Sequence, residues 1–238
     1  MPARLAVEEP VPSRKGNQGR VDLPELAETP TESRNRYRRP LALLTKRVLD
    51  MIGSGALIVI LSPLLLTLGL VILATDGAPI IYRRRVVGPR RSFDAYKFRT
   101  MIRDADMKLA LDPELKCAYE EQFKLKSDPR VTYLGSWLRK YSLDELPQLF
   151  NVLRGQMSLV GPRMITAPEL EKYGSHKELL LSVKPGLTGY WQIKGRQDVS
   201  YAERVHMDVH YIANWSLTLD IVILLKTPVR VIFGRGAY

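Results

Sequence analysis

The feature that most constrains this chain is an uncharged, apolar run from Met51 to Thr75. Leu, Ile, Val, Gly and Ala dominate this run, and no other stretch of the sequence resembles it. At about 1.5 Å per helical residue, it is long enough to reach across the apolar core of a bilayer, which takes roughly 20 residues. The sequence therefore predicts one membrane-embedded helix.

Ser62 and Pro63 stand in the middle of the apolar run. A proline inside a helix removes one backbone hydrogen bond, and its ring clashes with the carbonyl group four residues earlier, which here belongs to Val59. We therefore expect the helix to bend or break at this point. The hydroxyl group of Ser62 is placed to satisfy the freed carbonyl group, as Ser and Thr often do in lipid-embedded helices.

Basic residues flank the run on both sides. They are Arg34, Arg36, Arg38, Arg39, Lys46 and Arg47 before it, and Arg83, Arg84, Arg85, Arg90 and Arg91 after it. Because basic flanks tend to stay cytoplasmic, a straight crossing would export one cluster, whereas a helix bent back at Ser62-Pro63 keeps both inside. The flanks favour a re-entrant helix, and a spanning helix with a tolerated proline kink is the alternative.

These features divide the chain into three predicted segments. Residues 1–40 carry six prolines among charged and small residues, with too few large apolar side chains to offset the entropy of ordering, so we expect a disordered tail. Residues 41–80 form the membrane-embedded re-entrant helix, and residues 81–238 form a cytoplasmic domain.

The cytoplasmic domain is predicted to be α+β and mainly helical. Two short extended pieces, separated by the Gly88-Pro89 turn, indicate a small sheet, and residues 103–126 have the spacing of a surface helix interrupted near Pro113. Near the end, Trp215 precedes an apolar stretch that includes charged residues. This stretch suits an amphipathic helix in the membrane interface, with Trp215 at headgroup depth, and a buried core helix is the alternative.

Charge indicates the class of partner. Lys and Arg number 36 against 25 acidic residues, which gives a net charge of +11 and implies phosphates, acidic lipids or nucleic acid as partners. The apolar run argues against nucleic acid. The single Cys117 permits no intramolecular disulfide and is interpreted as a buried or bystander thiol. His206 and His210 lie four residues apart, but HMDVH lacks the Glu that zinc proteases use, so a metal role is the weaker interpretation.

Adjacent carboxylates at Asp144 and Glu145 begin the stretch that could carry chemistry. An apolar helical pattern follows them, so the pair should lie at or near a helix N-terminus, where partial positive charge keeps an Asp ionised and can hold a phosphate. A structural interpretation is equally open. Ser142 with Glu145 three residues later matches a capping box, in which both side chains only satisfy backbone groups.

Arginines surround the acidic pair in the sequence. Arg139 precedes it, Arg163 follows the rigid Gly161-Pro162 turn, and Arg99 and Arg130 could converge from elsewhere. Each of them alone is more often a solvated surface charge. A carboxylate that attacks a diphosphate needs such cations or a divalent metal, because it approaches like charge.

From about Thr45 to Tyr238 the chain resembles the bacterial sugar transferase family, the monotopic polyprenyl-phosphate phosphoglycosyl transferases. The motifs that carry the resemblance are LTKRVLD at 44–50, Ser62-Pro63, YKFRTM at 96–101, DPRVT at 128–132, LRKYSLDELPQLFNVLRGQMSLVGPR at 138–163, KPGLTGYWQIKGR at 184–196 and the closing NWSLTLDIVILLKT. The last two are similar to the branch that primes exopolysaccharide with hexose 1-phosphate.

The resemblance implies a covalent two-step mechanism. Asp144 would attack the β-phosphorus of a UDP-sugar, release UMP and hold the phospho-sugar, which a lipid phosphate such as undecaprenyl phosphate would then take. Mg²⁺ at Asp144 and Glu145 is expected, with Glu145 assisting in proton or metal handling. Arg139 and Arg163 would hold phosphate or nucleotide.

The resemblance also implies a place in the cell. Lys46, Arg47 and Asp50 would stabilise the end at which the helix enters the membrane, and residues 81–238 would be the catalytic domain on the cytoplasmic face of the bacterial inner membrane. The rival hypothesis is a noncatalytic protein that binds acidic membrane lipid and organises polysaccharide assembly. The sequence leaves open which sugar is transferred, which polysaccharide is made and whether the chain forms a homodimer.

Overall fold

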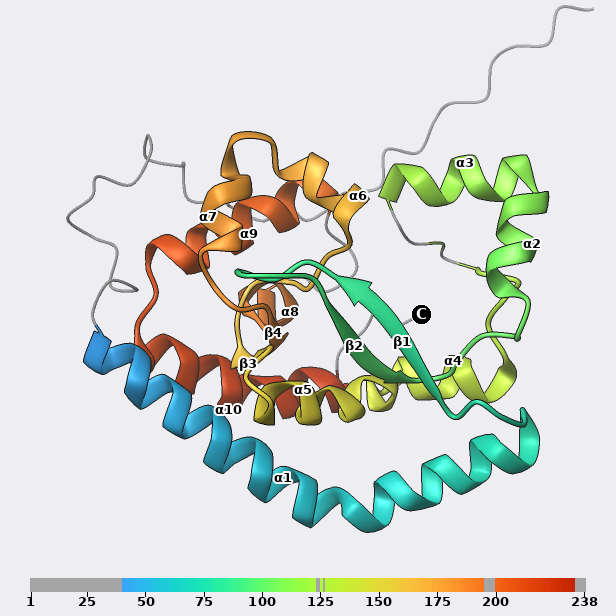
Figure 1. Ribbon diagram of the computed structural model, residues 1–238, viewed down its shortest axis with the longest axis horizontal. Coiled ribbons are helices and arrows are strands. Elements are labelled where there is room, and N and C mark those ends of the chain that lie inside the picture. Colours follow the sequence, from blue (N-terminus) through green and yellow to red (C-terminus); the bar gives the residue numbers. More distant parts are fainter. Residues whose placement is uncertain (1–39, 123–124, 126, 195–199, 234–238) are drawn as a thin grey trace, which may run out of the picture.

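A computed structural model describes residues 40–122, 125, 127–194 and 200–233 (Figure 1). The predicted tail lies outside these residues except for Pro40. In chain order the elements are α1 (Pro40–Thr75), β1 (Ile81–Val86), β2 (Phe93–Phe98), α2 (Ala105–Leu111), α3 (Pro113–Gln122), α4 (Tyr133–Lys140), the 3₁₀ helix η3 (Leu143–Gln148), α5 (Leu149–Leu153), β3 (Ser158–Val160), α6 (Ala167–Leu170), the 3₁₀ helix η4 (Glu171–His176), α7 (Lys177–Leu181), β4 (Gly186–Thr188), α8 (Tyr190–Lys194), α9 (Tyr201–Ala213) and α10 (Leu217–Phe233). The prediction of a mainly helical fold with a small sheet is confirmed.

Helix α1 is 36 residues long and contains Pro63. It bows along the lower edge of the molecule and remains one helix, so the predicted proline bends it without breaking it (Figure 1). The hydroxyl group of Ser62 donates to the carbonyl oxygen of Val59 at 2.8 Å, which confirms the predicted repair of the lost hydrogen bond. Among the described residues, α1 alone is long and apolar enough to cross a membrane.

Three side chains join the first turns of α1 to the rest of the protein. Lys46 donates to the carboxylate of Asp220 at 2.6 Å and to the carbonyl oxygen of Val160 at 2.9 Å. Arg47 donates to the last carbonyl groups of α5, at Val152 and Leu153. Asp50 accepts from the hydroxyl group of Ser158 at 3.0 Å and from the backbone N–H of Leu159 at 2.9 Å. These residues, predicted at the end where the helix enters the membrane, hold α1 against α10, α5 and β3.

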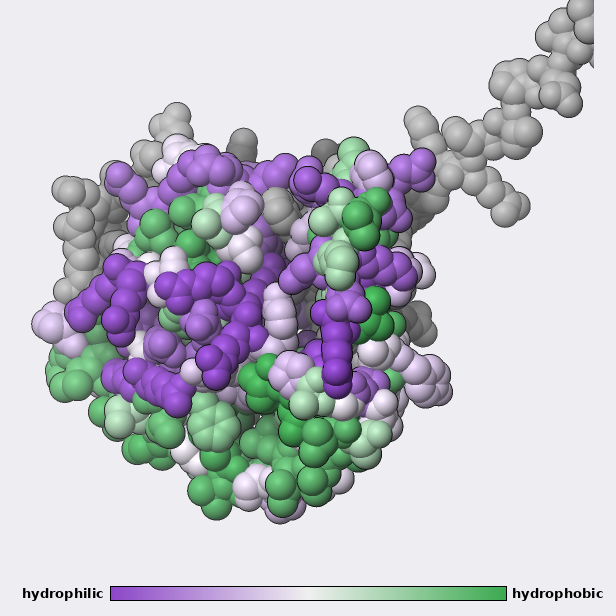
Figure 2. Space-filling view, turned by 45° about the vertical axis from the view of Figure 1, so that its right-hand side comes forward, coloured by the Kyte–Doolittle hydropathy of each residue, from purple (hydrophilic) through white to green (hydrophobic). Residues whose placement is uncertain are grey.

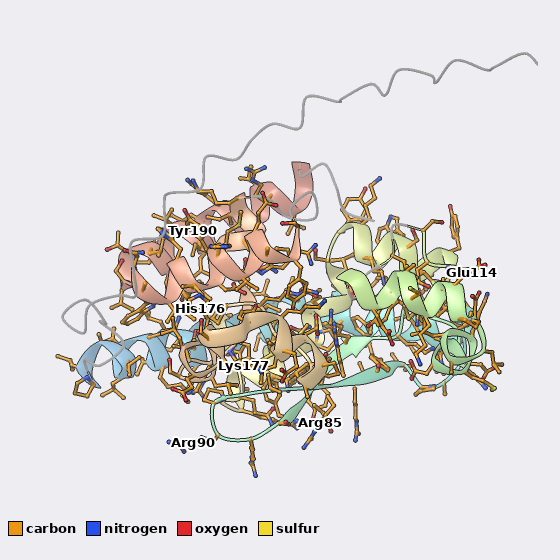
Figure 3. The ribbon with its side chains drawn as sticks, turned by 90° about the horizontal axis from the view of Figure 1, so that it is seen from above. Arg85, Arg90, Glu114, His176, Lys177 and Tyr190 are labelled. Carbon is orange, nitrogen blue, oxygen red and sulfur yellow. The ribbon has the colours of Figure 1, made fainter. Side chains whose placement is uncertain are left out.

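Strands β1 and β2 form an antiparallel hairpin in which Ile81 pairs with Phe98 and Val86 pairs with Phe93, as the Gly88-Pro89 turn predicted. Successive side chains of a strand point to opposite faces, so Phe93, Ala95 and Lys97 share one face of β2. Phe93 and Ala95 are buried in the core. Lys97, on the same face, therefore also points inward. The exposed Arg85 and Arg90 belong to the hairpin region labelled in Figure 3.

The predicted interrupted surface helix is confirmed as α2 and α3, which flank Asp112. Cys117 on α3 is exposed, so the bystander interpretation holds and the buried one is wrong.

The core lies between β3, β4 and the helices around them, and includes Leu149, Val160, Ile165 and Ile212. Strands β3 and β4 run parallel, with Ser158 paired to Gly186. They meet closely, because a Cβ atom on Gly161 would lie 2.6 Å from the backbone nitrogen of Gly186. A glycine is therefore required immediately after β3.

The expectation that Trp215 lies at headgroup depth is wrong. Its side chain is only 1% exposed, and its indole N–H donates to the carboxylate of Asp220 at 3.0 Å. The indole is therefore satisfied inside the protein. Helix α10 has features of both predicted alternatives, the interfacial amphipathic helix and the buried core helix. Ile223 is fully buried, whereas Leu225 is 72% exposed.

Apolar side chains gather on one side of the surface. Figure 2 shows a hydrophobic lower part and a hydrophilic upper part, and the lower part is the side along which α1 runs in Figure 1. Exposed apolar residues of α1 include Ile52, Val59, Ile60 and Leu66. A large exposed apolar surface of this kind marks an interaction with a membrane or a partner.

Candidate active site

The acidic pair lies where the chain turns from α4 into η3. Ser142, between the two helices, adopts the left-handed conformation with φ 55°, and it is the only non-glycine residue with positive φ in the described part of the chain. Asp144 and Glu145 then stand in the first turn of η3. The position near a helix N-terminus is as predicted, although the helix is 3₁₀. Such backbone strain is concentrated at functional sites.

The capping-box interpretation of this turn is wrong. The Ser142 side chain makes no capping hydrogen bond. The carboxylate of Glu145 instead accepts a hydrogen bond from the ammonium group of Lys97 on β2 at 2.6 Å. Glu145 therefore binds a cation from β2 instead of capping the helix.

Lys97 is a site residue that the sequence interpretation missed. Its nitrogen lies 2.6 Å from Glu145 and 3.9 Å from the Oδ2 atom of Asp144, so one cation bridges both carboxylates. The signal available in the sequence was a lysine on the inward face of a strand whose other inward residues are apolar. A half-buried lysine in that position needs a carboxylate partner.

The two carboxylates differ in proton affinity. Burial raises the pKa of Asp144, whereas the nearby charges of Lys97 and Arg139 lower it in part. Burial also acts to raise the pKa of Glu145, but the charge and hydrogen bond of Lys97 outweigh it, and the pKa is lowered. Lys97 therefore favours the ionised form of Glu145, whereas burial of Asp144 outweighs its neighbouring cations.

Arg139, at the end of α4, is a predicted site arginine whose charge acts directly on Asp144. Burial lowers the pKa of its guanidinium group, and the charge of Asp144 raises it in part. Its Nε–H donates to the hydroxyl group of Thr100 at 2.9 Å. The Thr100 backbone in turn presses against Gly135, where an added Cβ atom would collide with the carbonyl group of Thr100. Arg139 is thus held beside Asp144 by a closely packed support.

Arg163 comes to the same site from the turn formed by Gly161 and Pro162. Its charge acts on Glu145 and lowers the pKa of that carboxyl group, together with Lys97. Its backbone N–H donates to the buried carboxylate of Asp208 at 3.2 Å. The turn is therefore fixed by Asp208 on α9, and the guanidinium group lies over the ring of Trp191 on α8.

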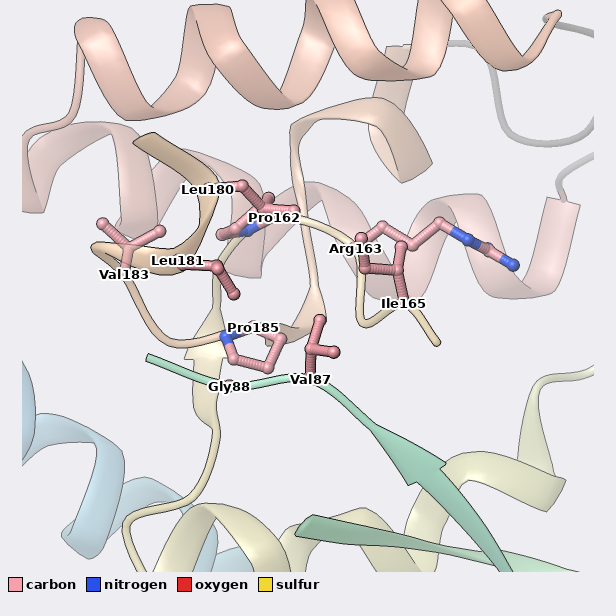
Figure 4. Close-up of a pocket in the computed structure, with 9 residues that line it drawn as sticks. All are labelled: Val87, Gly88, Pro162, Arg163, Ile165, Leu180, Leu181, Val183 and Pro185. Atoms are coloured by element: carbon pink, nitrogen blue, oxygen red, sulfur yellow. The ribbon is translucent and has the colours of Figure 1, made fainter. Parts of the chain in front are cut away.

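A small pocket beside this turn is a different feature (Figure 4). Apart from Arg163, it is lined by Val87, Gly88, Pro162, Ile165, Leu180, Leu181, Val183 and Pro185. The side chain of Arg163 extends away from these residues in Figure 4. The pocket contains no carboxylate, so we assign the chemistry to the acidic pair.

Two of the predicted arginines are engaged elsewhere. Arg99 donates to the carbonyl oxygens of Asp76 and Gly77, just after α1, at 2.6 Å each. Arg130 forms a two-pronged ion pair with Asp128, at 2.8 and 2.7 Å. Arg99 therefore supports the end of α1. The charges of Asp128 and Arg130 both act on Arg139, so Arg130 lies near the arginine of the site. Neither Arg99 nor Arg130 forms an ion pair with Asp144 or Glu145 in the described residues.

The donor set fits Mg²⁺ only in part. In the described residues no group of three or more His, Cys, Asp and Glu side chains lies close enough to hold a metal. Asp144 and Glu145 offer two adjacent carboxylates, and Mg²⁺ is commonly bound by one or two carboxylates together with water and substrate phosphates. His206 is exposed, and the ring of His210 lies 5.2 Å from that of Tyr190, centre to centre.

The family model of bacterial sugar transferases matches residues 41–234, which include α1 and the acidic pair. The chain belongs to the bacterial sugar transferase family. It is therefore an enzyme that transfers sugar phosphate, and its single long apolar helix agrees with a membrane-associated family member.

Individual relatives are closely similar. The chain is 49% identical over 206 residues to the exopolysaccharide production protein ExoY of Sinorhizobium fredii, covering 84% of this chain and 91% of ExoY. It is 47% identical over 198 residues to the undecaprenyl-phosphate galactose phosphotransferase of Salmonella typhimurium, covering 81% of this chain. It is 46% identical over 197 residues to the UDP-galactose-lipid carrier transferase of Erwinia amylovora, again covering 81% of this chain. The chain spans 41% of the length of each of the last two proteins.

Proposed function

We propose that this sugar transferase moves a sugar 1-phosphate from a UDP-sugar to undecaprenyl phosphate and releases UMP, as the priming step of exopolysaccharide synthesis. The names of the relatives from Salmonella, Erwinia and Sinorhizobium support the acceptor, the donor and the pathway class. One observation carries the chemistry: a buried carboxylate, Asp144, lies 3.9 Å from the ammonium group of Lys97, and the charge of Arg139 also acts on it. A nucleophile for a diphosphate needs this arrangement, because the cations offset the charge of both reactants.

In the first step, a carboxylate oxygen of Asp144 attacks the β-phosphorus of the donor. The bond from that phosphorus to the oxygen bridging the two phosphates breaks, and UMP leaves with the bridging oxygen. The sugar phosphate remains on Asp144 as an acyl phosphate. Lys97 and Arg139 stabilise the negative charge that develops around phosphorus in this step.

In the second step, a phosphate oxygen of the lipid acceptor attacks the same phosphorus. The bond to the Asp144 oxygen breaks, the carboxylate is restored, and the lipid diphosphate sugar is released. Two moderate barriers replace one high barrier, which is the usual gain from covalent catalysis. Glu145 keeps Lys97 in place through the 2.6 Å ion pair during both steps.

Mg²⁺ is the cofactor that the proposed reaction calls for, and Asp144 and Glu145 would hold it. When bound, it would neutralise phosphate charge beside the nucleophile.

The membrane arrangement is part of the proposal. The bowed α1 enters the cytoplasmic leaflet of the bacterial inner membrane and turns back, so that residues 81–238 stay on the cytoplasmic face. Support comes from Pro63 inside α1, from the basic residues on both flanks and from the apolar surface along α1. A lipid phosphate held at the bilayer surface could then meet Asp144 without a helix that crosses.

The test is UMP release by the purified protein with a panel of UDP-sugars, undecaprenyl phosphate and Mg²⁺. Asp144→Asn should reduce turnover by a factor of at least about 10³, because an amide cannot form the acyl phosphate. Asp106→Asn is the matched control, since Asp106 is an exposed carboxylate on α2 and should retain full activity.

Mass spectrometry of protein quenched during turnover should place the sugar phosphate on Asp144. Undiminished UMP release by Asp144→Asn, or an adduct on another side chain, would refute the nucleophile. Membrane binding without UMP release from any UDP-sugar would favour the noncatalytic lipid-binding alternative.

A further inference from the structure

Trp191 on α8 lies between two arginines that come from distant parts of the chain. The guanidinium carbon of Arg163 is 5.1 Å from the centre of the indole ring, and that of Arg204 on α9 is 5.7 Å from it. Trp191 is 8% exposed and Arg204 is 4% exposed, so this cluster is largely closed to water. Arginine pairs with indole rings favourably at such distances.

The two guanidinium groups lie close enough to repel each other. Burial lowers the pKa of Arg204, and the charge of Arg163 lowers it further. The Nε–H of Arg163 is buried and has no hydrogen-bond partner among the described residues. The buried carboxyl group of Asp208 acts on both arginines, but burial raises its pKa to about 7, so it offsets their charge only in part. An anionic ligand beside Arg163 would offset the remaining positive charge.

The cluster adjoins the acidic pair through Arg163. The same guanidinium charge that acts on Arg204 also acts on Glu145. Cations thus follow one another from Lys97 and Arg139, which act on Asp144, through Arg163 to Arg204. A UDP-sugar has a second phosphate next to its β-phosphorus, and Arg163 supplies a cation for it near Glu145.

The support for this cluster comes from α9. The carboxylate of Asp208 accepts the backbone N–H of Arg163 and the hydroxyl group of Tyr173 at 2.8 Å. Arg204 lies four residues earlier on the same helix, so one rigid element positions both arginines. Preorganised donors of this kind bind a phosphate without the cost of rearrangement.

We propose that Arg204, packed on Trp191 beside Arg163, is a further binding residue for the nucleotide half of the donor and holds the phosphate that leaves as UMP. This inference rests on the proposed function, and it assigns Arg204 to the leaving group rather than to the sugar or the lipid. Arg204 binds without taking part in bond making, since Asp144 performs the attack.

The test compares Arg204→Gln with Arg85→Gln, an exposed arginine on β1. Loss of a charge-assisted hydrogen bond to phosphate should raise the KM for every UDP-sugar by about 10- to 100-fold. The inhibition constant of UMP should rise by a similar factor, whereas the KM for undecaprenyl phosphate should stay unchanged. Arg85→Gln should leave all three values at the wild-type level.

Arg204→Lys separates binding from folding. It keeps the buried charge but loses the planar fork, so it should fold as the wild type does and still weaken UMP inhibition. If folded Arg204→Lys and Arg204→Gln both keep the wild-type KM for UDP-sugars and the wild-type inhibition constant of UMP, the inference is overturned. A rise in the lipid KM alone would overturn it as well.

Calorimetry with UMP alone makes the inference independent of turnover. Wild-type protein should bind UMP, and Arg204→Lys should bind it about tenfold or more weakly. If no UDP-sugar is turned over yet UMP binding still depends on Arg204, the proposed reaction fails and the nucleotide site stands. If UDP-sugars are turned over but UMP binding does not depend on Arg204, the proposed reaction stands and the inference about Arg204 is overturned.

Discussion

Lys97 lies beside two carboxylates that differ in how readily they take up a proton. It lowers the pKa of both, and burial leaves the pKa of Asp144 raised even so. Lys97→Met should therefore raise the pKa of Asp144 further. Because the nucleophile must be ionised, the acid limb of the kcat/KM profile should move to higher pH, with a greater loss of activity at pH 6 than at pH 8.

Lys97→Arg is the matched variant, because it keeps a positive charge at the same position. Its acid limb should lie near that of the wild type. An identical acid limb in Lys97→Met would mean that Asp144 does not control the profile. The pH dependence of UMP release, measured with saturating Mg²⁺, decides between these outcomes.

Ser142 holds a backbone conformation that side chains resist. Ser142→Val should lower the free energy of unfolding by about 1–2 kcal/mol and reduce activity, since a β-branched residue fits poorly at positive φ. Ser142→Gly should be close to wild type in both respects. Thermal unfolding in detergent and UMP release measure the two effects, and equal stability of the Val and Gly variants would contradict the strained turn.

The acidic pair could be predicted from the sequence because its neighbours in the chain are also its neighbours in space. For Lys97 the sequence signals only an inward lysine that needs a carboxylate partner, because its contact with Glu145 depends on how β2 packs against η3. Arg99 was predicted to face the site and instead binds carbonyl groups after α1. Sequence patterns show that an arginine is charged, but not which oxygen atoms the fold presents to it.

Among elements, α1 is secured to α10 by a buried ion pair. Lys46→Met would leave the carboxylate of Asp220 buried, with Tyr211 and Trp215 as its remaining donors in the described part of the chain. The free energy of unfolding should fall by about 3–5 kcal/mol, as is usual when one partner of a buried pair is removed. Chemical denaturation in detergent micelles measures this loss.

Two comparisons make the result specific. Lys177→Met breaks the partly exposed pair with Glu171 and should cost at most about 1 kcal/mol. Adding Asp220→Asn to Lys46→Met removes the stranded charge and should recover part of the loss. A double variant as unstable as Lys46→Met alone would argue against the charge as the cause.

Elements were predictable where their determinants are local. The apolar run and the Ser62–Val59 hydrogen bond follow from spacing within one helix, and both predictions were correct. The burial of Trp215 was not predictable in this way. A tryptophan at the start of an amphipathic helix has the same sequence pattern whether it faces headgroups or a carboxylate such as Asp220, and the packing of α10 determines which it meets.

For the whole molecule, the re-entrant arrangement makes a topological prediction. Tags at the two ends of the chain should both resist protease added outside spheroplasts. Pro63→Leu restores the backbone donor and favours a straighter helix, so part of the population should expose the N-terminal tag. Pro228→Leu, a change at another helical proline in α10, should not. Exposure of that tag in the wild type would show that α1 spans the membrane.

The contact between Gly135 and Thr100 gives the molecule a vulnerability of another kind. No functional group is lost in Gly135→Ala, and yet its methyl group would collide with the backbone of Thr100, the residue whose hydroxyl group accepts from Arg139. We expect this variant to be inactive because the added methyl group shifts Thr100 and Arg139. Its acidic pair and its exposed apolar surface would keep all their side chains. A genetic screen for inactive transferases would therefore recover a substitution at a residue that never meets substrate.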